Sequence, residues 1–563
     1  MGKTRRAIAT VDLETDPFKR DRVPQPFMVG FYDGERFRRF DDVSSFMRYI
    51  SDKEFIIYAH NGGKFDFHYM FEFLEPWTDV LIIHGRLVKF KIGECEFRDS
   101  YSILPIPLSA YKKDAIDMAK LEPEVRHKHL PEIERYLRGD CVYLYELVTD
   151  FVRDYGNSLT LAGAAMQFWS KHFEHEKPIS SQTFYDTIKD YYYGGRVECF
   201  AKGIIPSKRF QVVDINSAYP YAMLHKHPLS TSYETVRPKR GEAVIPQSLY
   251  TVVATSRGAF PRRAEDKSLE FPTDDVAREY KVTGWELQAA LDTGRADVHE
   301  VVSRLDFLKE LDFEDYVSHF YKIKSTAKKD TTAYLFSKLM MNSLYGKFGA
   351  NPATYKSYGL VPREDAEQVE KDASIRLGRA VGPWRWAGSV GHMGLMAGEH
   401  IVVDADGRKQ SVNNPVESDF YNAATAASIT GFVRAYLLRH MDAVQKAGGR
   451  LFYCDTDSVV FEAAPDDVSP FRFSKALGDW SHEGYFVRGG IAGKKLYAFL
   501  GEDGKWKAAR KGVRLEPEQI MEVAAGGEVE WEAQAPSFTM SARVKTGKRE
   551  IKPVFMKRKI KGT

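Results

Sequence analysis

Acidic residues lie within or at the end of three short apolar runs that are far apart in this 563-residue chain. The runs are Ala7–Glu14, Phe210–Asp214 and Leu451–Phe461. Their length and apolar composition predict β-strands, and the last run reads as two strands around a turn at Asp455–Asp457. The sequence therefore favours sheets that present carboxylates from a strand face or a strand end.

The composition is that of a large globular protein. Hydrophobic residues make up 43% of the chain and charged residues 28%, which excludes a disordered or collagen-like protein. At about 100–200 residues per domain, the length indicates about three to five domains or one multi-lobed enzyme. The four cysteines are dispersed, which excludes a disulfide scaffold and a zinc ribbon.

The charge is unevenly distributed. The chain has 81 Lys and Arg against 78 Asp and Glu, yet Lys322–Lys329 and Lys545–Lys561 are strongly basic. Such clusters indicate local binding sites for polyanions, although a solvated surface or a tail would explain either run alone. No stretch approaches the ~18 apolar residues of a membrane span, and no signal peptide is present, so we expect a cytosolic protein without membrane contact.

Other patterns predict an α/β N-terminal third and a mixed remainder. Further strands are expected at Glu54–Ala59 and Val80–Ile83. Pro131–Tyr155 has helical periodicity, and Gly156 ends it. Thr331–Phe348 is also helical in pattern. Residues 351–418 have weak periodicity, which is typical of an inserted subdomain or a long loop.

Four acids and a phenol in the N-terminal third suit a two-metal site. Asp12 and Glu14 are two apart in a strand, so both project from one face. The glycines before Asp66 let the chain turn back toward them, and Tyr136 and Asp140 share one helix face. Mg²⁺ prefers oxygen ligands, and two such ions about 4 Å apart clamp the reacting oxygens in phosphodiester hydrolysis.

A second group of residues suits a nucleoside triphosphate. If the strands that end at Asp214 and Asp455 are neighbours, the two carboxylates can share metals beside a triphosphate. Lys338, Asn342 and Tyr345 follow the spacing i, i+4, i+7 on one helix stripe, with Lys toward phosphates and Tyr toward a base. A helix whose polar face is in solvent explains the same stripe.

Together, six segments resemble the motifs of family B DNA polymerases, in the family's order. D-x-E, N-G-G-K-F-D and Y-x-x-x-D resemble the motifs of the 3′→5′ exonuclease. D-x-x-S-x-Y-P, K-x-x-x-N-S-x-Y-G and Y-x-D-T-D-S resemble those of the polymerase centre. The resemblance implies an α/β and α+β multidomain fold: an RNase H-like exonuclease, then a right-hand polymerase of palm, fingers and thumb with two inserted subdomains.

Further segments resemble the protein-primed branch of that family, and the strings H-N-G-G-K-F-D-F and T-A-A-S-I-T-G look most like tectivirus-type phage polymerases. The branch has a Y-x-G-G link that contacts template, a K-x-Y motif that holds the primer strand and a T-x-x-x-R element that contacts template. It also has a lysine that assists the exonuclease and a strand-contacting serine, the loosest match here. The counterparts, in that order, are Tyr192, Gly194 and Gly195; Lys495 and Tyr497; Thr430 and Arg434; Lys113; and Ser100.

The long intervals between the polymerase motifs leave room for the two insertions of this branch, one that grips the protein primer and one that encircles template and separates strands. The implied domains are the exonuclease, 1–185; the palm, 186–230 and 419–500; the primer-protein insertion, 231–315; palm and fingers, 316–350; the strand-displacement insertion, 351–418; and the thumb, 501–563.

The resemblance also implies roles for the site residues, with two Mg²⁺ per centre and Mn²⁺ able to substitute. The exonuclease would use Asp12, Glu14, Asp66 and Asp140 as metal ligands, Tyr136 to position water, and Asn61 and Phe65 to contact the frayed strand. The polymerase would use Asp214 and Asp455 as metal ligands, Asp457 as support, Lys338 and Lys324 at the phosphates, Tyr219 to exclude a 2′-hydroxyl, and Asn342 and Tyr345 at the nascent pair.

The implied function is DNA-directed DNA synthesis with proofreading, on a linear viral genome, from a terminal-protein primer and with strand displacement. The implied partners are template and primer DNA, dNTPs and a terminal protein, with the enzyme a monomer or a heterodimer in the host bacterial cytoplasm. A polymerase of the same fold that needs no protein primer is one alternative. A non-catalytic DNA-binding replication scaffold is another, although the intact Asp214, Asp455 and Asp457 argue against it.

Overall fold

The computed structural model describes most of the chain. The described residues are 6–536 and 553–561, except 18, 20–22, 71–72, 75–78, 84–85, 176–177, 179, 240, 351–355, 363–384, 391–392, 398–400, 404–408, 412–421 and 464–469. The first part of the basic run at the C-terminus and much of the 351–418 insertion therefore lie outside the described residues. Among the described residues, no helix is long and apolar enough to cross a bilayer.

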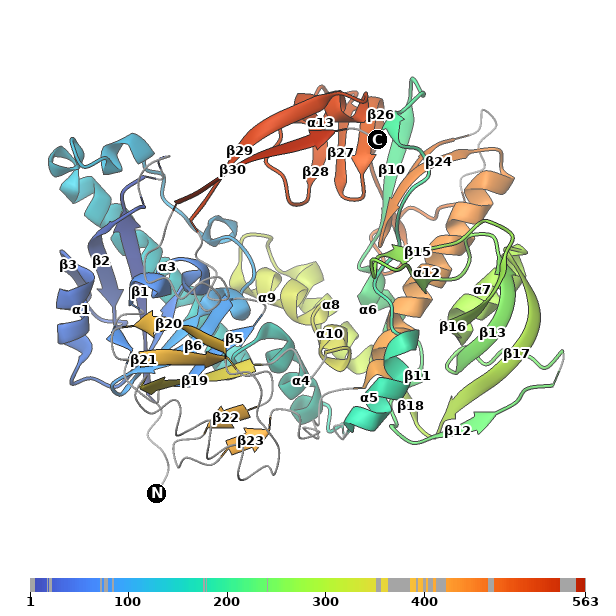
Figure 1. Ribbon diagram of the computed structural model, residues 1–563, viewed down its shortest axis with the longest axis horizontal. Helices are drawn as coiled ribbons and strands as arrows, with labels where there is room; N and C mark the ends of the chain where they lie inside the picture. Colours follow the sequence, from blue (N-terminus) through green and yellow to red (C-terminus); the bar gives the residue numbers. More distant parts are fainter. Residues whose placement is uncertain are drawn as a thin grey trace.

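The first lobe is built on a mixed sheet, drawn in blue at the left of Figure 1. Its strands, in spatial order, are β5 (Asp79–Ile83), β6 (Arg86–Ile92), β7 (Cys95–Asp99), β4 (Phe55–Ala59), β1 (Ala7–Thr15), β2 (Pro26–Tyr32) and β3 (Phe37–Phe40). The helices of this lobe are α1 (Val43–Ile50), α2 (Phe67–Met70) and α3 (Leu130–Tyr155). The strands and the long helix predicted here are confirmed, and Gly156 ends α3 with a φ of 81°.

Helix α3 packs on β1 and β2 through apolar side chains. Ile133 and Leu137 are fully buried, and the Thr10 hydroxyl of β1 donates to the carbonyl of Cys141 at 2.8 Å. A Cβ on Gly30 of β2 would lie 2.7 Å from Leu137 Cγ, so glycine lets the helix approach the sheet. This packing sets Asp140 of α3 above the face of β1.

The same sheet continues into residues from the second half of the chain. Beyond β5 come β19 (Lys356–Pro362), β21 (Met393–Ala397) and β20 (Arg385–Val390). Strand β19 pairs antiparallel with β5, Lys356 opposite Ile82. The segment expected as an inserted subdomain or loop thus contributes strands to the first lobe, together with a separate hairpin of β22 (Ile401–Val403) and β23 (Lys409–Ser411).

A second large sheet forms the upper right of Figure 1. Its main strands, in spatial order, are β28 (Trp506–Arg510), β27 (Leu496–Gly501), β26 (Trp480–Gly493), β10 (Phe210–Ile215), β25 (Ser458–Glu462), β24 (Arg450–Asp455) and β8 (Val197–Cys199), with β9 (Gly203–Ile204) paired to β26. The long helix α12 (Ala423–Lys446) packs against this sheet and is buried along most of its length. The strands predicted around Asp214 and Asp455 are confirmed, and both border β25.

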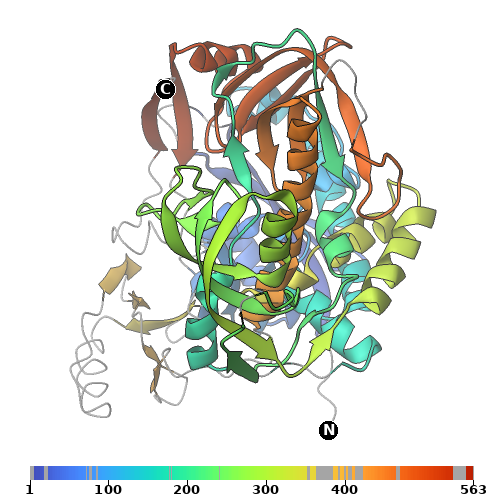
Figure 2. The same ribbon diagram turned by 90° about the vertical axis from the view of Figure 1, so that its right-hand side faces the viewer.

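A smaller unit, green at the right of Figure 1 and facing the viewer in Figure 2, lies on the other side of α12. Its sheet has the order β12 (Tyr233–Val236), β17 (Ala296–Phe307), β13 (Leu249–Ser256) and β16 (Ala277–Thr283). Helix α7 (Gly284–Thr293) covers this sheet, and their core includes Ala435 and Leu438 of α12. Two small pairs flank it: β14 (Arg262–Arg263) with β15 (Leu269–Glu270), and β11 (His227–Pro228) with β18 (Glu310–Leu311).

Helices fill the space between the lobes. They are α4 (Leu161–His172), α5 (Gln182–Ile188), α6 (Ala218–Ala222), α8 (Glu314–Thr326), α9 (Thr332–Met341) and α10 (Leu344–Phe348). The single helix predicted over Thr331–Phe348 is wrong in one respect, because it ends at Met341 and restarts at Leu344. Asn342 caps the first part, and its side-chain amide turns back to the carbonyl of Lys338 at 2.7 Å, which competes with a continuous helix.

The chain ends in α13 (Pro517–Ala524) and a hairpin of β29 (Glu528–Pro536) with β30 (Pro553–Lys561). The described part of the basic C-terminal run is therefore a paired strand. Lys559 forms ion pairs with Glu528 at 3.1 Å and with Glu530. Acids on the neighbouring strand thus offset part of the positive charge of this run.

Candidate active sites

The structure brings the four acids of the N-terminal third together. Asp12 and Glu14 project from β1, Asp66 precedes α2, and Asp140 comes from α3. Burial and the charges of the other three acids raise the pKa of Asp12 well above its usual value. Burial and the charge of Asp140 raise the pKa of Glu14 to about 8. Carboxylates that destabilise one another's charge in this way favour a bound cation.

Asp66 is fixed in this group by the backbone. Its pKa rises to about 7 because it is buried, while a hydrogen bond from the N–H of Leu13, between Asp12 and Glu14, partly offsets the rise. Asp66 therefore faces the backbone that carries the two strand carboxylates.

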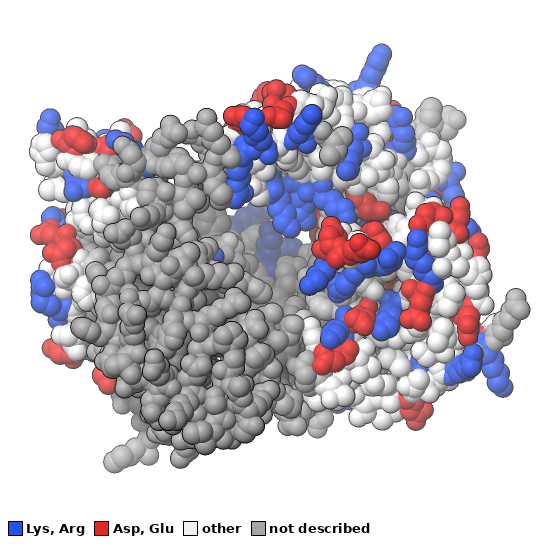
Figure 3. Space-filling model, in the orientation of Figure 1, with Lys and Arg blue, Asp and Glu red and all other residues white. Residues whose placement is uncertain are grey.

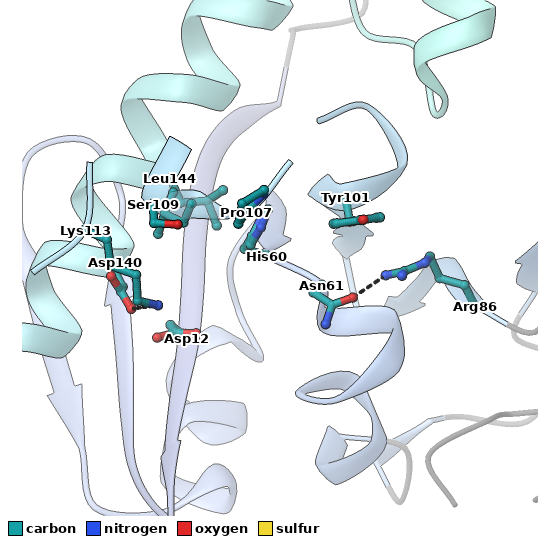
Figure 4. Close-up of a pocket in the computed structure, with 11 residues that line it drawn as sticks. Asp12, His60, Asn61, Arg86, Tyr101, Pro107, Ser109, Lys113, Asp140 and Leu144 are labelled. Carbon is teal, nitrogen blue, oxygen red and sulfur yellow. Dashed lines mark hydrogen bonds and ion pairs between the residues drawn. The ribbon is translucent and has the colours of Figure 1, made fainter. Parts of the chain in front are cut away.

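One lysine lies inside the acidic group (Figure 4). Lys113 Nζ is 3.3 Å from Asp140 Oδ2 and 5.5 Å from the centre of the Tyr136 ring. Burial opposes its charge, but the Tyr136 hydroxyl and Asp140 raise the pKa of Lys113. Burial also raises the pKa of Tyr136 to about 12, so this phenol stays protonated at neutral pH. Lys113 and Tyr136 thus lie next to the acids in the structure.

Asp12, Asp140 and Lys113 line a pocket of about 590 Å³. Its wall also includes His60, Asn61, Arg86, Tyr101, Pro107, Leu108, Ser109 and Leu144. Asn61 has a φ of 60°, a left-handed conformation that costs energy for a residue other than glycine and is common at functional sites. The side-chain oxygen of Asn61, Oδ1, accepts a hydrogen bond from Arg86 Nη1 at 2.7 Å (Figure 4).

Arg86 was missed by the sequence reasoning, because no local pattern distinguishes it. Its Nη1 also donates to Asp99 Oδ2 at 2.6 Å, and its guanidinium lies 4.5 Å from the centre of the Tyr101 ring. Arg86 thus fixes Asn61 at the pocket entrance.

Two predicted strand-contact residues differ in exposure. Phe65 is half-buried with its ring edge against Tyr69, 5.6 Å between centres. Ser100 is fully buried, and its hydroxyl donates to the Ala59 carbonyl at 3.2 Å and lies 3.1 Å from His60 Nδ1. The Ser100 side chain thus fixes the pocket residue His60, and its contact with the DNA strand stays a prediction.

The donor set of this pocket suits a hard divalent cation. Asp140 Oδ1 is buried without a hydrogen-bond partner among the described residues, and carboxylate oxygens are the ligands that Mg²⁺ prefers. Within the described part of the chain, however, no three His, Cys, Asp or Glu side chains already converge as a preformed metal centre.

The second group of acids lies where three strands of the large sheet end. Asp214 of β10 and Asp455 of β24 both face Ser458 of β25, so they flank the turn that carries Asp457. The N–H of Ile215 donates to the carbonyl of Asp457 at 2.8 Å, which ties this turn to β10. The strands that carry Asp214 and Asp455 are therefore not neighbours, because β25 lies between them, but both acids lie opposite the same residue of β25.

Burial and charge repulsion raise the pKa of Asp214, beside this turn, and of Asp457, within it. Burial and the charge of Asp457 raise the pKa of Asp214 to about 7, and burial raises the pKa of Asp457 to about 6. The charge of Glu483 contributes to both shifts. Glu483, on β26 beside β10, is an acid of this site that the sequence reasoning missed.

Lys495, which the resemblance places in the motif that holds the primer strand, contacts an acid of this group. Its Nζ lies 2.6 Å from Oδ1 and 2.8 Å from Oδ2 of Asp455, and its N–H donates to the Tyr453 hydroxyl at 2.9 Å. The structure thus pairs Lys495 with the Asp455 carboxylate, whereas Tyr497 stacks on Phe499 with 4.4 Å between ring centres.

Aromatic side chains of α6 and α10 lie near Asp457, since burial and the charge of Asp457 both raise the pKa of Tyr219 and Tyr345, and lysines of α8 and α9 lie close by. Tyr219 and Tyr345 stack at 4.2 Å between ring centres with an interplanar angle of 20°. Lys324 Nζ lies 3.2 Å from the Ser217 hydroxyl, and burial and the charge of Lys338 lower the pKa of Lys324. The two lysines are therefore close to each other. The side-chain amide of Asn342, an exposed residue, donates to the carbonyl of Lys338.

The Tyr192–Gly195 link contacts the acidic turn directly. A Cβ on Gly195 would lie 2.5 Å from Thr456 Oγ1, so this position requires glycine, while Gly194 is exposed. Arg434 is only 2% exposed and donates to the carbonyls of Tyr193 and Gly194, 2.7 Å each.

Two residues expected to touch template are thus buried. Arg434 supports the link from behind, and the Thr430 hydroxyl, 2% exposed, donates to the carbonyl of Ala427 at 3.2 Å. Both side chains are buried on α12 in this structure, and their contact with template stays a prediction.

On the face shown in Figure 3, Lys and Arg side chains gather around a hollow near its upper centre. Such a concentration of positive charge suits a phosphate backbone. Carboxylates at the ends of strands of one sheet, with stacked aromatics and lysines nearby, suit the metal-dependent transfer of a nucleotide to a nucleic acid strand.

Comparison with known proteins gives the family. Residues 110–377 match the family model described as DNA polymerase type B, organellar and viral. The chain is 33% identical over 599 aligned positions to the DNA-directed DNA polymerase of Enterobacteria phage PRD1, covering 99% of this chain and 98% of that protein. It is 24% identical to the DNA polymerase of Bacillus phage phi29, over 87% and 86% of the two chains. This chain belongs to the family B DNA polymerases of the PRD1 and phi29 type, the protein-primed group.

The fold agrees with that assignment. The structure of phi29 DNA polymerase with primer-template DNA and incoming nucleotide superposes with a TM-score of 0.71, at 19% identity, over 95% of this chain and 98% of the other. The predicted fold class is therefore confirmed, and the chain is a DNA-directed DNA polymerase.

Proposed function

We propose that this polymerase uses two separate centres, one for nucleotide addition and one for 3′→5′ proofreading, and starts from a terminal protein. The observation that carries the two-centre proposal is the presence of two distant groups of buried acids, each bordered by a lysine ion pair. These pairs are Lys113 with Asp140, and Lys495 with Asp455. An exonuclease in the first lobe and a palm in the second account for both groups.

In the polymerase centre, Asp214 and Asp455 would hold two Mg²⁺, and Asp457 and the tied turn would support these acids. When bound, the ions would supply charge neutralisation for the transfer of the phosphoryl group. Lys338 and Lys324 neutralise the triphosphate, and Tyr345 with Asn342 borders the nascent pair. Tyr219 lies beneath Tyr345, where its ring excludes a 2′-hydroxyl.

In the exonuclease centre, Asp12, Glu14, Asp66 and Asp140 hold the metals. Tyr136 stays protonated and positions the attacking water, and Lys113 fixes Asp140 and Tyr136 in relation to each other. The frayed 3′ strand enters through the pocket past Asn61 and Phe65.

The proposed domains follow the boundaries expected from the sequence. The compact sheet with α7 within residues 231–315 is the unit that contacts the protein primer, and residues 351–418 form the strand-displacement insertion. Tyr192, Gly194, Gly195, Lys495 and Tyr497 guide the DNA strands. The enzyme replicates a linear viral genome in the host bacterial cytoplasm, as a monomer or as a heterodimer with the terminal protein.

A 5′-labelled primer annealed to a longer template tests the two-centre proposal in one gel. With Mg²⁺ and dNTPs the primer should lengthen, and without dNTPs it should shorten from its 3′ end, with Mn²⁺ in place of Mg²⁺ giving both reactions. Lengthening without any shortening would contradict the proposed exonuclease activity. Neither reaction would favour a non-catalytic scaffold.

Priming needs its own assay. The polymerase, its candidate terminal protein and a labelled dNTP should give a labelled protein band that survives denaturing electrophoresis. If labelling never occurs while oligonucleotide primers extend normally, the alternative of a polymerase without a protein primer is preferred.

A further inference from the structure

Hydrogen bonds to four of its carbonyl groups hold the link between the two lobes, Tyr192–Arg196. At one end the N–H of Thr456, in the acidic turn of the polymerase centre, donates to the carbonyl of Arg196 at 2.7 Å. The other bonded carbonyls are those of Tyr192, Tyr193 and Gly194. The unit within residues 231–315 supplies one donor, Arg263, and its residue Glu286 holds the other donor, Arg434.

The first donor is Arg263 of β14. Its Nη2 donates to the carbonyl of Tyr192 at 2.7 Å, and its guanidinium lies 5.1 Å from the centre of the Tyr193 ring. Arg263 is exposed, so its position depends on this contact rather than on packing. The neighbouring Arg262 instead pairs with Glu270 within the hairpin, at 3.5 Å.

The second donor is Arg434 of α12, which is itself held by α7. Glu286 Oε1 accepts from Arg434 Nε at 2.7 Å, and both side chains are 2% exposed. The other oxygen of Glu286 accepts from the N–H of Thr283 at 3.0 Å and from its hydroxyl at 2.9 Å, which completes a capping box.

Glycine permits this arrangement. A Cβ on Gly431 of α12 would lie 2.3 Å from Thr283 Oγ1, so only glycine lets the start of α7 approach α12 this closely. Arg434 Nη1 makes two further hydrogen bonds, whereas Nη2 has no partner among the described residues. Breaking a buried ion pair is costly because the other charge is then left alone, so the pair with Glu286 restricts the position of Arg434.

A third contact involves Phe271, which directly follows β15. The guanidinium of Arg196 lies 4.1 Å from the centre of the Phe271 ring, and Arg196 is only 4% exposed. Arg263 of β14 and Phe271, just after β15, thus contact the two ends of the link.

We propose that Arg263 and Glu286 are positioning residues of the polymerase centre: by fixing the carbonyl groups of the Tyr192–Arg196 link, they hold the turn that carries Asp455 and Asp457. The unit within residues 231–315 thereby sets the geometry of nucleotide addition, in addition to any contact with a protein primer. This inference rests on the proposed assignment of Asp455 to the polymerase centre.

Arg263→Ala tests the inference, with Arg262→Ala as the matched control. The two arginines are neighbours, and both changes remove one exposed charge. Under single-turnover conditions on primer-template DNA, Arg263→Ala should lower the maximal rate of nucleotide incorporation by about tenfold, the effect of one hydrogen bond from a charged donor. Its dissociation constant for DNA and the salt dependence of that constant should match those of Arg262→Ala.

Equal incorporation rates for the two variants would overturn the inference. So would a weaker, less salt-dependent affinity for DNA in Arg263→Ala alone, since that result identifies a phosphate contact. Asp455→Ala, measured alongside, separates this inference from the proposed function. If Asp455→Ala still adds nucleotides, the assignment of the centre itself is wrong.

Glu286→Gln tests the buried end. The amide still accepts from Thr283 but no longer matches the charge of Arg434, so the incorporation rate should fall at unchanged DNA affinity. If this variant fails to fold, the comparison of Arg263→Ala with Arg262→Ala decides alone.

Discussion

Lys495 Nζ lies within 2.8 Å of both carboxylate oxygens of Asp455, and its backbone has a φ of 59°. Ser217, Thr456 and Lys495 all hold left-handed conformations, and all three border the same acids. Such conformations cost about 1–3 kcal/mol each and persist where the surroundings impose them. The polymerase centre is therefore a region of stored backbone strain, held by its neighbours.

Lys495→Ala should slow primer extension by about tenfold or more, because Asp455 loses a charged partner and the primer strand loses a cation. Incorporation rate and primer-template affinity are measured together. Lys505→Ala is the control. Lys505 is highly exposed, and its ion pair with Asp503 is long, at 3.8 Å. Extension equal to that of the control would exclude a role for Lys495.

Asp455→Ala and Asp66→Ala should have opposite effects. Loss of a metal-binding carboxylate removes several kcal/mol of transition-state stabilisation, about a thousandfold in rate. Asp455→Ala should thus abolish extension and keep 3′ digestion, and Asp66→Ala should do the reverse, as read on the labelled-primer gel. If either change removed both reactions, the two-centre assignment would be wrong.

Tyr219→Val should admit ribonucleotides, because the ring stacked on Tyr345 no longer fills the space of a 2′-hydroxyl. Ribonucleotide insertion relative to dNTP insertion should rise by about 10–100-fold. Competing rNTP and dNTP incorporation opposite one template base measures this ratio. Tyr321→Val is the control. The Tyr321 hydroxyl donates to the backbone carbonyl of Lys475, so this variant should leave the ratio unchanged.

Arg86→Ala should weaken single-strand digestion through KM, since Asn61 loses the donor that fixes it at the pocket entrance. It should also lower the free energy of unfolding by about 1–3 kcal/mol, because the fully buried Asp99 carboxylate loses its cation. Steady-state digestion and thermal unfolding are measured against Arg39→Ala, whose partners are surface acids. A change in kcat with KM intact would contradict this positioning role.

Stability should depend on pH through the exonuclease acids. Burial raises the pKa of Glu14 to about 8 and that of Asp66 to about 7 in the folded protein, whereas both titrate near ~4 when unfolded. Between these values the unfolded chain binds fewer protons, so stability falls as pH rises from about 4 to about 8.

Mg²⁺ binds the ionised acids, so it should raise the unfolding temperature more at pH 8 than at pH 5. Glu14→Gln with Asp66→Asn should reduce both the pH slope and the Mg²⁺ effect. An equal Mg²⁺ effect at the two pH values would show that these acids do not bind the ion.

The elements that carry the chemistry could be predicted from the sequence because their signals are local. Apolar runs that end in Asp214 and Asp455 encode strands, and Gly156 encodes a helix end. The helix break at Asn342 was missed because a side-chain bond to Lys338, rather than helix periodicity, decides it.

Contacts between distant residues could not be predicted in the same way. Arg434 with Glu286, and Arg86 with Asn61, join elements that meet only through the packing of α12 on α7 and of the first sheet. Ser100 and Thr430 match motifs in sequence, yet burial decides what their hydroxyls can reach.

Strand β19 pairs with β5, although it follows the palm and fingers helices in the chain. The first lobe is therefore not a self-contained module. A fragment of residues 1–185 would expose the backbone edge of β5, and such an edge is a template for aggregation. Exchange of the first lobe between relatives by simple recombination is accordingly constrained, because a donor lobe must accept a strand supplied by the recipient.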